Sequence, residues 1–268
     1  MSLLHRKAVA AVPPRPAATT LILRDGEPGL EVLMVRRSPQ ASFMPGAYVF
    51  PGGAVDTADG SDAALARCDE DAATLARRLG GVTQLGDAAP AYAVAALREC
   101  FEECGLWLGV DALPSAAALR SRLHGGEPLP ALAAAAGLTL ATSRLQAWDR
   151  WITPVGIPKR FDTLFVVVAA PRAQHPSVDE GETTTLAWVH PPAALAAQAQ
   201  GGFQMEFATL AIVRSLLPFA GGTAQALLEQ AAARTAITPV QPRLRLDEQG
   251  HIVGILLPGQ PGYDDASA

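Results

Sequence analysis

Short runs of apolar residues, bounded by glycine, proline and charged residues, predict a series of β-strands along the chain. The clearest run is 161–170, where a continuous F-D-T-L-F-V-V-V core is typical of a strand buried on both faces of a sheet. Residues 17–23 and 30–36 predict a hairpin joined by a polar turn. Further strands are expected at 48–50, at 183–189, and in a C-terminal hairpin made of 243–246 and 252–257.

Apolar residues at helical spacing predict helices between and after these strands. The helix expected over 203–219 carries an apolar stripe that includes Phe207 and Leu210 and would face a core. The other predicted helices cover 63–79, 115–123, 129–136, 193–200 and 224–233. This order of strands and helices favours an α/β fold with one mixed sheet covered by helices on both faces.

Composition along the chain divides it into three parts. Residues 1–16 combine charged residues with three prolines and are interpreted as a flexible N-terminal tail. The main domain is predicted to span 17–219, and it includes a helical insertion at 57–89. Residues 220–268 are predicted to form a C-terminal extension made of one helix and a hairpin.

The overall composition favours a folded domain and offers no global attraction for nucleic acid. Hydrophobic residues make up 49% of the 268 residues, which is ample for a core, and the formal net charge is −5. An acidic balance provides no basic field, so no nucleic-acid partner is expected. Three cysteines are too few for a disulfide framework, and no stretch has the length of a membrane span. We therefore expect a cytoplasmic protein with no membrane partner, and we leave a homodimer open.

The stretch 97–106 (LRECFEECGL) combines strong helix formers with three glutamates and ends where Gly105 predicts a C-cap. Glu99 and Glu103 are one helical turn apart, and Glu102 shares their face. These carboxylates repel one another near the negative end of the helix dipole. A hard divalent cation such as Mg²⁺ would relieve the repulsion, because it prefers oxygen ligands. A solvated acidic face is the alternative interpretation.

The pattern R-E-x-x-E-E-x-G-L that starts at Arg98 resembles the second half of the Nudix box, and Gly52-Gly53 resembles its opening glycines. In this family the box is a loop, helix and loop that holds divalent metal against the diphosphate of a substrate. The usual spacing of eight residues from acidic residue to arginine is here 39, from Asp59 to Arg98, so 57–89 splits the box. A split box is similar to that of the peroxisomal coenzyme A diphosphatases. The resemblance implies an α/β/α sandwich. Because both ends of the insertion belong to the metal loop, we expect the insertion to pack beside the mouth of the active site.

The resemblance also implies the residues that would bind metal. Glu99 and Glu103 are the first candidates for ligands of Mg²⁺ or Mn²⁺. Glu102 would be a further ligand or a base, and the backbone carbonyl of Gly52 would complete the set.

Catalytic roles follow from the same resemblance. Arg98 would hold a box glutamate in place by an ion pair, rather than being an ordinary surface charge. Nudix enzymes often use a glutamate outside the box as general base, and Glu182 occupies such a place in an acidic turn. The base stays open between Glu182 and Glu102, because the turn can equally be a solvated loop.

Four basic residues are candidates for substrate binding. The stretch 33–53 (LMVRRSPQASFMPGAYVFPGG) is similar to the segment before the box in coenzyme A-type Nudix hydrolases, which makes Arg36 and Arg37 candidate phosphate ligands. Strand alternation would point only one of these two inward. Lys159 and Arg160 lie in a stretch that resembles the split-box subgroup. Their alternative role is an ordinary pairing with acidic loops.

The resemblance implies divalent-metal-dependent hydrolysis of a diphosphate linkage in a small nucleoside diphosphate derivative. Coenzyme A or an acyl-coenzyme A is the leading substrate, and a nucleotide sugar or dinucleotide is an alternative. A Nudix-fold binding or sensor module without catalysis is a second alternative, although such proteins usually lose a box glutamate and this chain keeps all three. RNA cap removal gains no support from the acidic balance.

Overall fold

The computed structural model describes residues 5–40, 45–178 and 183–266. Within these ranges the main structural element is a seven-stranded mixed sheet with strand order β3-β2-β1-β6-β5, in which β4 also pairs with β1 and β7 with β2. The central strands β1 (Arg15–Asp25) and β6 (Phe161–Ala169) run parallel. The remaining strands of this sheet are β2 (Leu30–Arg37), β3 (Tyr48–Val49), β4 (Gly52–Ala54), β5 (Gln146–Ile152) and β7 (Thr183–Val189).

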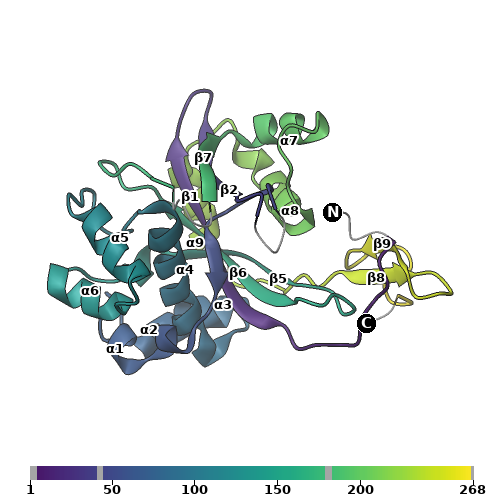
Figure 1. Cartoon of the computed structure of the whole chain (residues 1–268), viewed down its shortest axis with the longest axis horizontal. Coiled ribbons are helices and arrows are strands. Elements are labelled where there is room, and N and C mark those ends of the chain that lie inside the picture. The colour runs from purple at the N-terminus through teal and green to yellow at the C-terminus, as the bar shows by residue number, and fades with distance from the viewer. Residues whose placement is uncertain (1–4, 41–44, 179–182, 267–268) are drawn as a thin grey trace.

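Helices cover both faces of this sheet, as the sequence predicted (Figure 1). On one face lie α1 (Asp62–Leu65), α2 (Ala72–Leu75), α3 (Gly81–Thr83), α4 (Ala89–Cys104), α5 (Ala116–His124) and α6 (Leu129–Ala136). On the other face lie α7 (Pro191–Ala199), α8 (Phe207–Ser215) and α9 (Ala224–Ala232). Short 3₁₀ turns occur at Thr57–Gly60, Gly86–Ala88, Thr142–Arg144 and Leu217–Phe219. The α/β/α sandwich is confirmed.

The pleat of β1 explains why the sheet has a hydrophobic core on each side. Successive side chains of a strand point to opposite faces. Ala18 and Ile22 accordingly belong to the core beneath α4, while Leu21 and Leu23 belong to the core beneath α8. A strand buried on both faces needs a nearly continuous apolar sequence, which β1 and β6 have.

The insertion is not the single helix predicted over 63–79. It folds as α1, a turn, α2, a π-helical segment at Ala76–Gly80 and α3. The break occurs because Asp71 caps a new helix by accepting a hydrogen bond from the Thr74 amide at 2.9 Å. Gly80 directly follows the predicted helix, but the helical backbone continues through it into α3. A Cβ at Gly80 would lie 2.2 Å from the Gly86 carbonyl oxygen, so this glycine permits close packing of two backbone segments.

Two other elements differ from expectation. Strand β5 was not predicted, because polar residues interrupt its apolar ones, and Asp149 and Arg150 stand at its centre. The predicted helix over 203–219 begins only at Phe207. It ends at Ser215 and is followed by a 3₁₀ turn that contains Pro218.

The C-terminal hairpin, β8 (Arg243–Leu246) and β9 (Ile252–Leu256), is confirmed and lies beyond the β5–β6 end of the main sheet (Figure 1). It has a small core of its own with Ile157. The N-terminal segment, expected as a tail, makes backbone hydrogen bonds to this hairpin: the His5 amide donates to Ile252 and the Ala8 amide to Gly250, at 2.8 and 3.0 Å. Strand β1 then starts at Arg15, inside the predicted tail.

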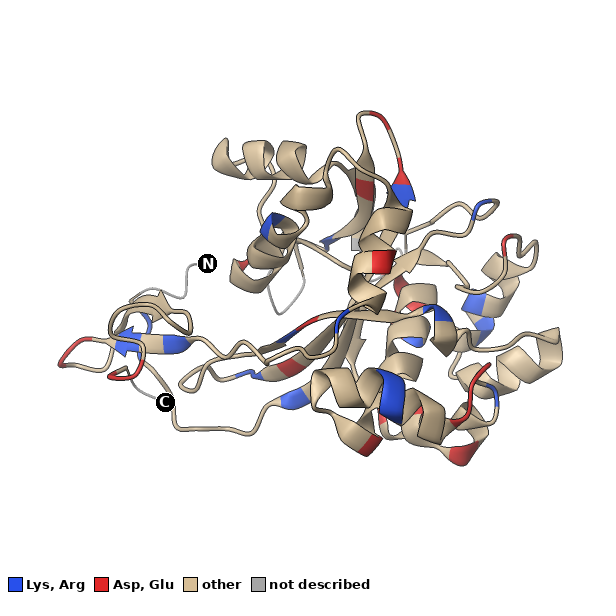
Figure 2. Cartoon of the chain, turned by 180° about the vertical axis from the view of Figure 1, so that it is seen from behind, with Lys and Arg blue, Asp and Glu red and all other residues tan. Residues whose placement is uncertain are grey.

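No individual helix in the described part of the chain is long and apolar enough to cross a membrane. The pair Phe207–Phe219 and Ala224–Ala232 meets that test only when the two are taken together, and they are bent by 107°. In the view of Figure 2, the described Lys and Arg residues are interleaved with Asp and Glu over the sheet and the helices and do not form one continuous basic stripe.

Candidate active site

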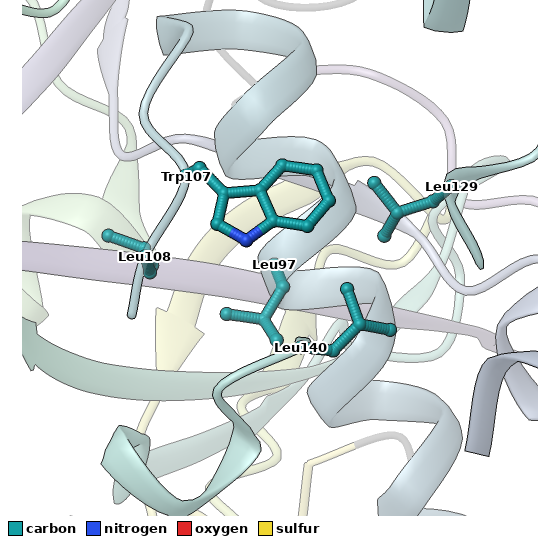
Figure 3. Close-up of a pocket in the computed structure, with 5 residues that line it drawn as sticks. All are labelled: Leu97, Trp107, Leu108, Leu129 and Leu140. Carbon is teal, nitrogen blue, oxygen red and sulfur yellow. The ribbon is translucent and has the colours of Figure 1, made fainter. Parts of the chain in front are cut away.

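Helix α4 carries the three glutamates on one side, and its apolar side packs into the hydrophobic core. A small gap of about 10 Å³ behind it is lined by Leu97, Trp107, Leu108, Leu129 and Leu140 (Figure 3). This volume holds at most one water, so the apolar side of α4 is closely packed. Phe101 meets the Trp107 ring edge to face, with centroids 5.1 Å apart. Gly105 ends the helix in the left-handed conformation, φ 68°, as predicted.

Arg98 is the centre of an ion-pair network on the acidic side of α4. Its Nη1 donates to Glu99 Oε1 and to Glu102 Oε2, both at 2.8 Å. Its Nε and Nη2 donate to the two carboxylate oxygens of Asp59, at 2.9 and 3.0 Å. A further bond from Nη2 reaches the Ala54 carbonyl at 2.9 Å. Arg98 therefore orients two of the glutamates, in line with the ion-pair role that the resemblance implied.

Asp59 connects the glycine-containing half of the split box to helix α4 through its contact with Arg98. Its side chain is buried, 3% exposed, and it also accepts a hydrogen bond from the Asp56 amide at 2.8 Å. Asp56 itself is largely exposed and lies 3.7 Å from Arg98. The sequence placed Asp59 at the usual spacing after the glycines but assigned it no role in the active site; it was a candidate cap, with Ser61, for the insertion helix. Its partner could not be identified there, because the insertion separates the two residues.

The glycine loop brings backbone close to the glutamates. The Gly52 amide donates to Glu103 Oε2 at 3.0 Å, and Glu103 is buried. At Gly53 a Cβ would lie 2.4 Å from Glu99 Oε1, so any larger residue would displace that carboxylate. Both glycines lie in β4, which pairs with β1. The structure thus joins the two halves of the split box at one place.

Burial raises the proton affinity of two of the carboxylates. It raises the pKa of Glu99 to about 7, because the loss of solvent outweighs the attraction of Arg98 and Glu102 adds repulsion. Burial also raises the pKa of Glu102, against the lowering effect of the same arginine. For Arg98, burial disfavours the charge but the surrounding carboxylates outweigh it, so its pKa is raised above the usual value. The charged forms of Glu99 and Glu102 are therefore costly in this buried site even with Arg98 beside them.

A cavity of about 730 Å³ opens in front of these carboxylates. Its walls come from β1, β3, β4, β6, the end of β2, α4, the end of α5, α8 and the loop before β6. Glu99, Glu102 and Glu103 form its acidic side. Alternate residues of β6, Phe161, Thr163 and Phe165, form part of its floor. The insertion contributes no residue to this lining among those described, so the expectation that it packs beside the mouth is not supported.

The four predicted substrate cations separate into two groups. Arg37 and Lys159 line the cavity. Arg36 is exposed and donates from Nε to the Gly46 carbonyl at 3.2 Å. Arg160 is buried and donates to the backbone carbonyls of Thr153 and Val12 at 2.9 and 2.6 Å. Arg36 and Arg160 are therefore not brought to the cavity, since each guanidinium is used in holding backbone.

Two basic residues of the cavity lining were not among the site residues predicted from the sequence. Arg15 lines the wall at the start of β1. Arg15, Ala17 and Thr19 alternate along one face of β1. The sequence prediction began this strand at Ala17, two residues too late to include Arg15. His124, at the end of α5, also lines the cavity, and its Nε2 lies 3.2 Å from the Glu102 carbonyl oxygen. Nothing in the local sequence connects α5 to the box.

Glu182, one of the two candidates for the general base, lies outside the described residues. Residues 177–178, which precede it in the chain, accept hydrogen bonds from Arg120. The Arg120 Nη1 donates to the carbonyls of Ser177 and Val178 at 2.9 and 3.0 Å, and its Nε donates to the Glu102 carbonyl at 2.7 Å. The last turn of α4 is thereby connected to the segment that precedes β7.

The donor set fits a hard divalent cation in its chemistry. Within the described ranges, no three His, Cys, Asp or Glu side chains already converge as a metal cage. Three carboxylates nevertheless line one cavity. Arg98 bonds one oxygen of Glu99 and one of Glu102, and each carboxylate has a second oxygen that can coordinate an ion. Burial makes the negative charge of Glu99 and Glu102 costly, as their raised pKa values indicate, and a bound cation would offset that cost.

Comparison with known proteins agrees with this geometry. Residues 8–203 match the family model described as the NUDT19 Nudix domain. A crystal structure of a Nudix hydrolase from Alicyclobacillus acidocaldarius is 30% identical, with a TM-score of 0.69. That alignment covers 86% of this chain and all of the other.

Curated relatives point to the same group. The acyl-coenzyme A diphosphatase NUDT19 of Gallus gallus is 30% identical over 66% of this chain and 61% of its own length. The human protein of that name is 27% identical over 61% of this chain and 54% of its own length. The matched region thus spans little more than half of these relatives.

Proposed function

We propose, from the premise that the chain belongs to the NUDT19 Nudix-domain family of Nudix hydrolases, that it hydrolyses the diphosphate of coenzyme A or an acyl-coenzyme A. The observation that carries this proposal is the placement of Glu99, Glu102 and Glu103 on one wall of a cavity that Arg37 and Lys159 also line. Such a cavity combines ligands for a metal with cations for phosphate. The names of the relatives support coenzyme A derivatives over other diphosphates.

The reaction adds one water across the P–O–P linkage. The water oxygen forms a bond to one phosphorus, the bridging P–O bond breaks, and a proton leaves the water. Two phosphate monoesters result, and for coenzyme A these are a pantetheine phosphate and adenosine 3′,5′-bisphosphate. Diphosphate hydrolysis depends mainly on positioning and on charge stabilisation, so the chain needs no covalent nucleophile.

We assign Glu99, Glu103 and Glu102 as side-chain ligands of the metal and the Gly52 carbonyl as a backbone ligand. Mg²⁺ or Mn²⁺ is proposed as the metal, because the donors are hard oxygens. A bound divalent ion would neutralise phosphate charge and lower the pKa of an attacking water. Arg98 keeps Glu99 and Glu102 aimed toward the cavity without touching the substrate, which makes it a positioning residue.

The proton acceptor is proposed to be either Glu102 or Glu182. Glu102 lines the cavity and its raised pKa favours proton uptake, but its contact with Arg98 favours a ligand role. The pH dependence of kcat separates the two. Replacing the true base with glutamine removes the acidic limb of the pH profile, whereas replacing a ligand weakens metal binding.

The test is a screen of diphosphates with Mg²⁺ or Mn²⁺, comparing coenzyme A, acetyl-coenzyme A, a nucleotide sugar and a dinucleoside polyphosphate. Hydrolysis of the coenzyme A compounds is expected to be fastest. Glu103→Gln should abolish it, because an amide cannot supply an anionic ligand, and the exposed Glu248→Gln serves as the charge-matched control. Turnover of Glu103→Gln within about tenfold of the wild type would reject the metal assignment. Faster hydrolysis of another diphosphate would reject coenzyme A as the substrate. Binding of these compounds without turnover would reject the proposal that the protein is an enzyme.

A further inference from the structure

The register of the central strands creates a corner at one end of the cavity. In the parallel pair, Arg15 of β1 lies opposite Phe161 of β6. The Arg15 amide donates to the Arg160 carbonyl at 2.9 Å, which places the backbone of Lys159 one residue away. Arg15, Lys159 and Phe161 all line the cavity. We call Arg15 and Lys159 the basic corner.

This basic corner lies at a distance from the glutamates along the same strand. Thr19 of β1 pairs with Gly52, whose amide binds Glu103. From Thr19 to Arg15 the strand advances four residues, or roughly 13 Å at the usual rise. The cavity therefore has an acidic end that suits a metal and a basic end that suits a second anion.

The charges of the basic corner are not neutralised locally. Arg15 and Lys159 are exposed, and neither forms an ion pair with any residue in the described part of the chain. The acidic residue nearest in sequence, Asp162, is bonded to Arg150 at 2.6 and 2.8 Å. Strand alternation places it on the opposite face from Phe161. Two like charges on neighbouring backbone segments of one cavity, without an ion-pair partner among the described residues, favour an anion.

We propose that Arg15 and Lys159 bind the phosphate that coenzyme A carries on its ribose, and so set the preference for a 3′-phosphorylated adenosine. This inference rests on the proposed function. In coenzyme A the ribose separates the 3′-phosphate from the diphosphate, so one molecule has an anion for each end of the cavity. The metal end holds the diphosphate that is cleaved, and the basic corner holds the phosphate that is not.

The experiment compares kcat/KM for coenzyme A and its 3′-dephospho form in the wild type, Arg15→Gln, Lys159→Gln and Arg172→Gln. Arg172 is an exposed cation outside this cavity and provides the matched control. The wild type is expected to prefer coenzyme A by about tenfold or more. Each basic-corner variant should lose most of that preference by slowing only coenzyme A, while Arg172→Gln keeps it.

A binding measurement makes the outcome independent of turnover. Calorimetry compares adenosine 3′,5′-bisphosphate with adenosine 5′-monophosphate on the same four proteins. Tighter binding of the bisphosphate, lost in Arg15→Gln and Lys159→Gln, supports the basic corner even if neither coenzyme is hydrolysed and the proposed function fails. Equal affinity of the wild type for the two nucleotides, or an unchanged preference in both variants, overturns the inference while leaving hydrolysis intact.

Discussion

The carboxylate of Asp59 binds the guanidinium of Arg98 through two hydrogen bonds of 2.9 and 3.0 Å, although 39 residues separate them in the chain. This pair closes the split box around its insertion. Asp59 is 3% and Arg98 11% exposed, so the pair is nearly dehydrated. The same guanidinium orients Glu99 and Glu102. The position of two carboxylates proposed to bind metal therefore depends on a residue that does not line the cavity.

Asp59→Asn should reduce both stability and activity. Removing one partner leaves a buried guanidinium with less compensation, which costs about 2 kcal/mol or more in the free energy of unfolding. Urea denaturation measures this loss. Asp56→Asn is the control, because Asp56 is exposed, lies 3.7 Å from Arg98 and should cost less than about 0.5 kcal/mol. Equal effects of the two variants would contradict the role given to Asp59.

Gly53→Ala should impair catalysis more than folding. The added Cβ would lie 2.4 Å from Glu99 Oε1, and the end of a flexible side chain can move aside at little cost in stability. The displaced carboxylate should lower kcat/KM by more than about tenfold, since a small misplacement of a catalytic group is costly. Gly81→Ala is the matched control, because nothing lies within 4 Å of its Cβ position and its φ is helical. Full activity of Gly53→Ala would show that Glu99 is not needed at this position.

Metal-free protein should lose stability as the pH rises through the titration of Glu99. Burial raises the pKa of this carboxyl from 4.5 to about 7, so between these values the folded state binds more protons than the unfolded state. The free energy of unfolding then falls with increasing pH across that window and is level above it. Glu99→Gln removes this dependence. The melting temperature of the variant, relative to the wild type, should therefore be higher at pH 8 than at pH 5.

Thermal melts in a chelator at both pH values measure this difference, with Glu248→Gln as the control. Adding Mg²⁺ at pH 8 should raise the melting temperature of the wild type, because the ion binds only the folded state. Metal binding near pH 6.5 should also release protons, which calorimetry in buffers of different ionisation enthalpy detects. A variant whose advantage is the same at both pH values would show that Glu99 is not protonated in the metal-free fold.

Leu79→Ala should destabilise the protein without changing KM. Leu79 lies in the insertion, is 1% exposed and belongs to the core beneath α4. Its truncation is expected to cost about 2–5 kcal/mol. Leu217→Ala, at a side chain that is 42% exposed, is the control and should cost less than about 1 kcal/mol. A changed KM with unchanged stability would instead support the expectation that the insertion packs beside the mouth of the active site.

Features that depend on neighbouring residues were determined by the sequence itself. The box helix ends at Gly105, and the glutamates share its face, because helical spacing and a left-handed cap are local properties. The buried core of β6 was equally legible, since a strand covered on both faces requires continuous apolar residues. The family resemblance of the box, confirmed by the match over 8–203, rests on the same local pattern.

The tertiary structure decided which charged residues meet at the cavity. Arg37 and Lys159 line it while Arg36 and Arg160 do not, because a strand or loop side chain faces the site only if its register allows. Arg15 joins them only through the pairing of two strands that are distant in the chain. Such contacts depend on register and packing between remote segments, and local propensity does not encode them.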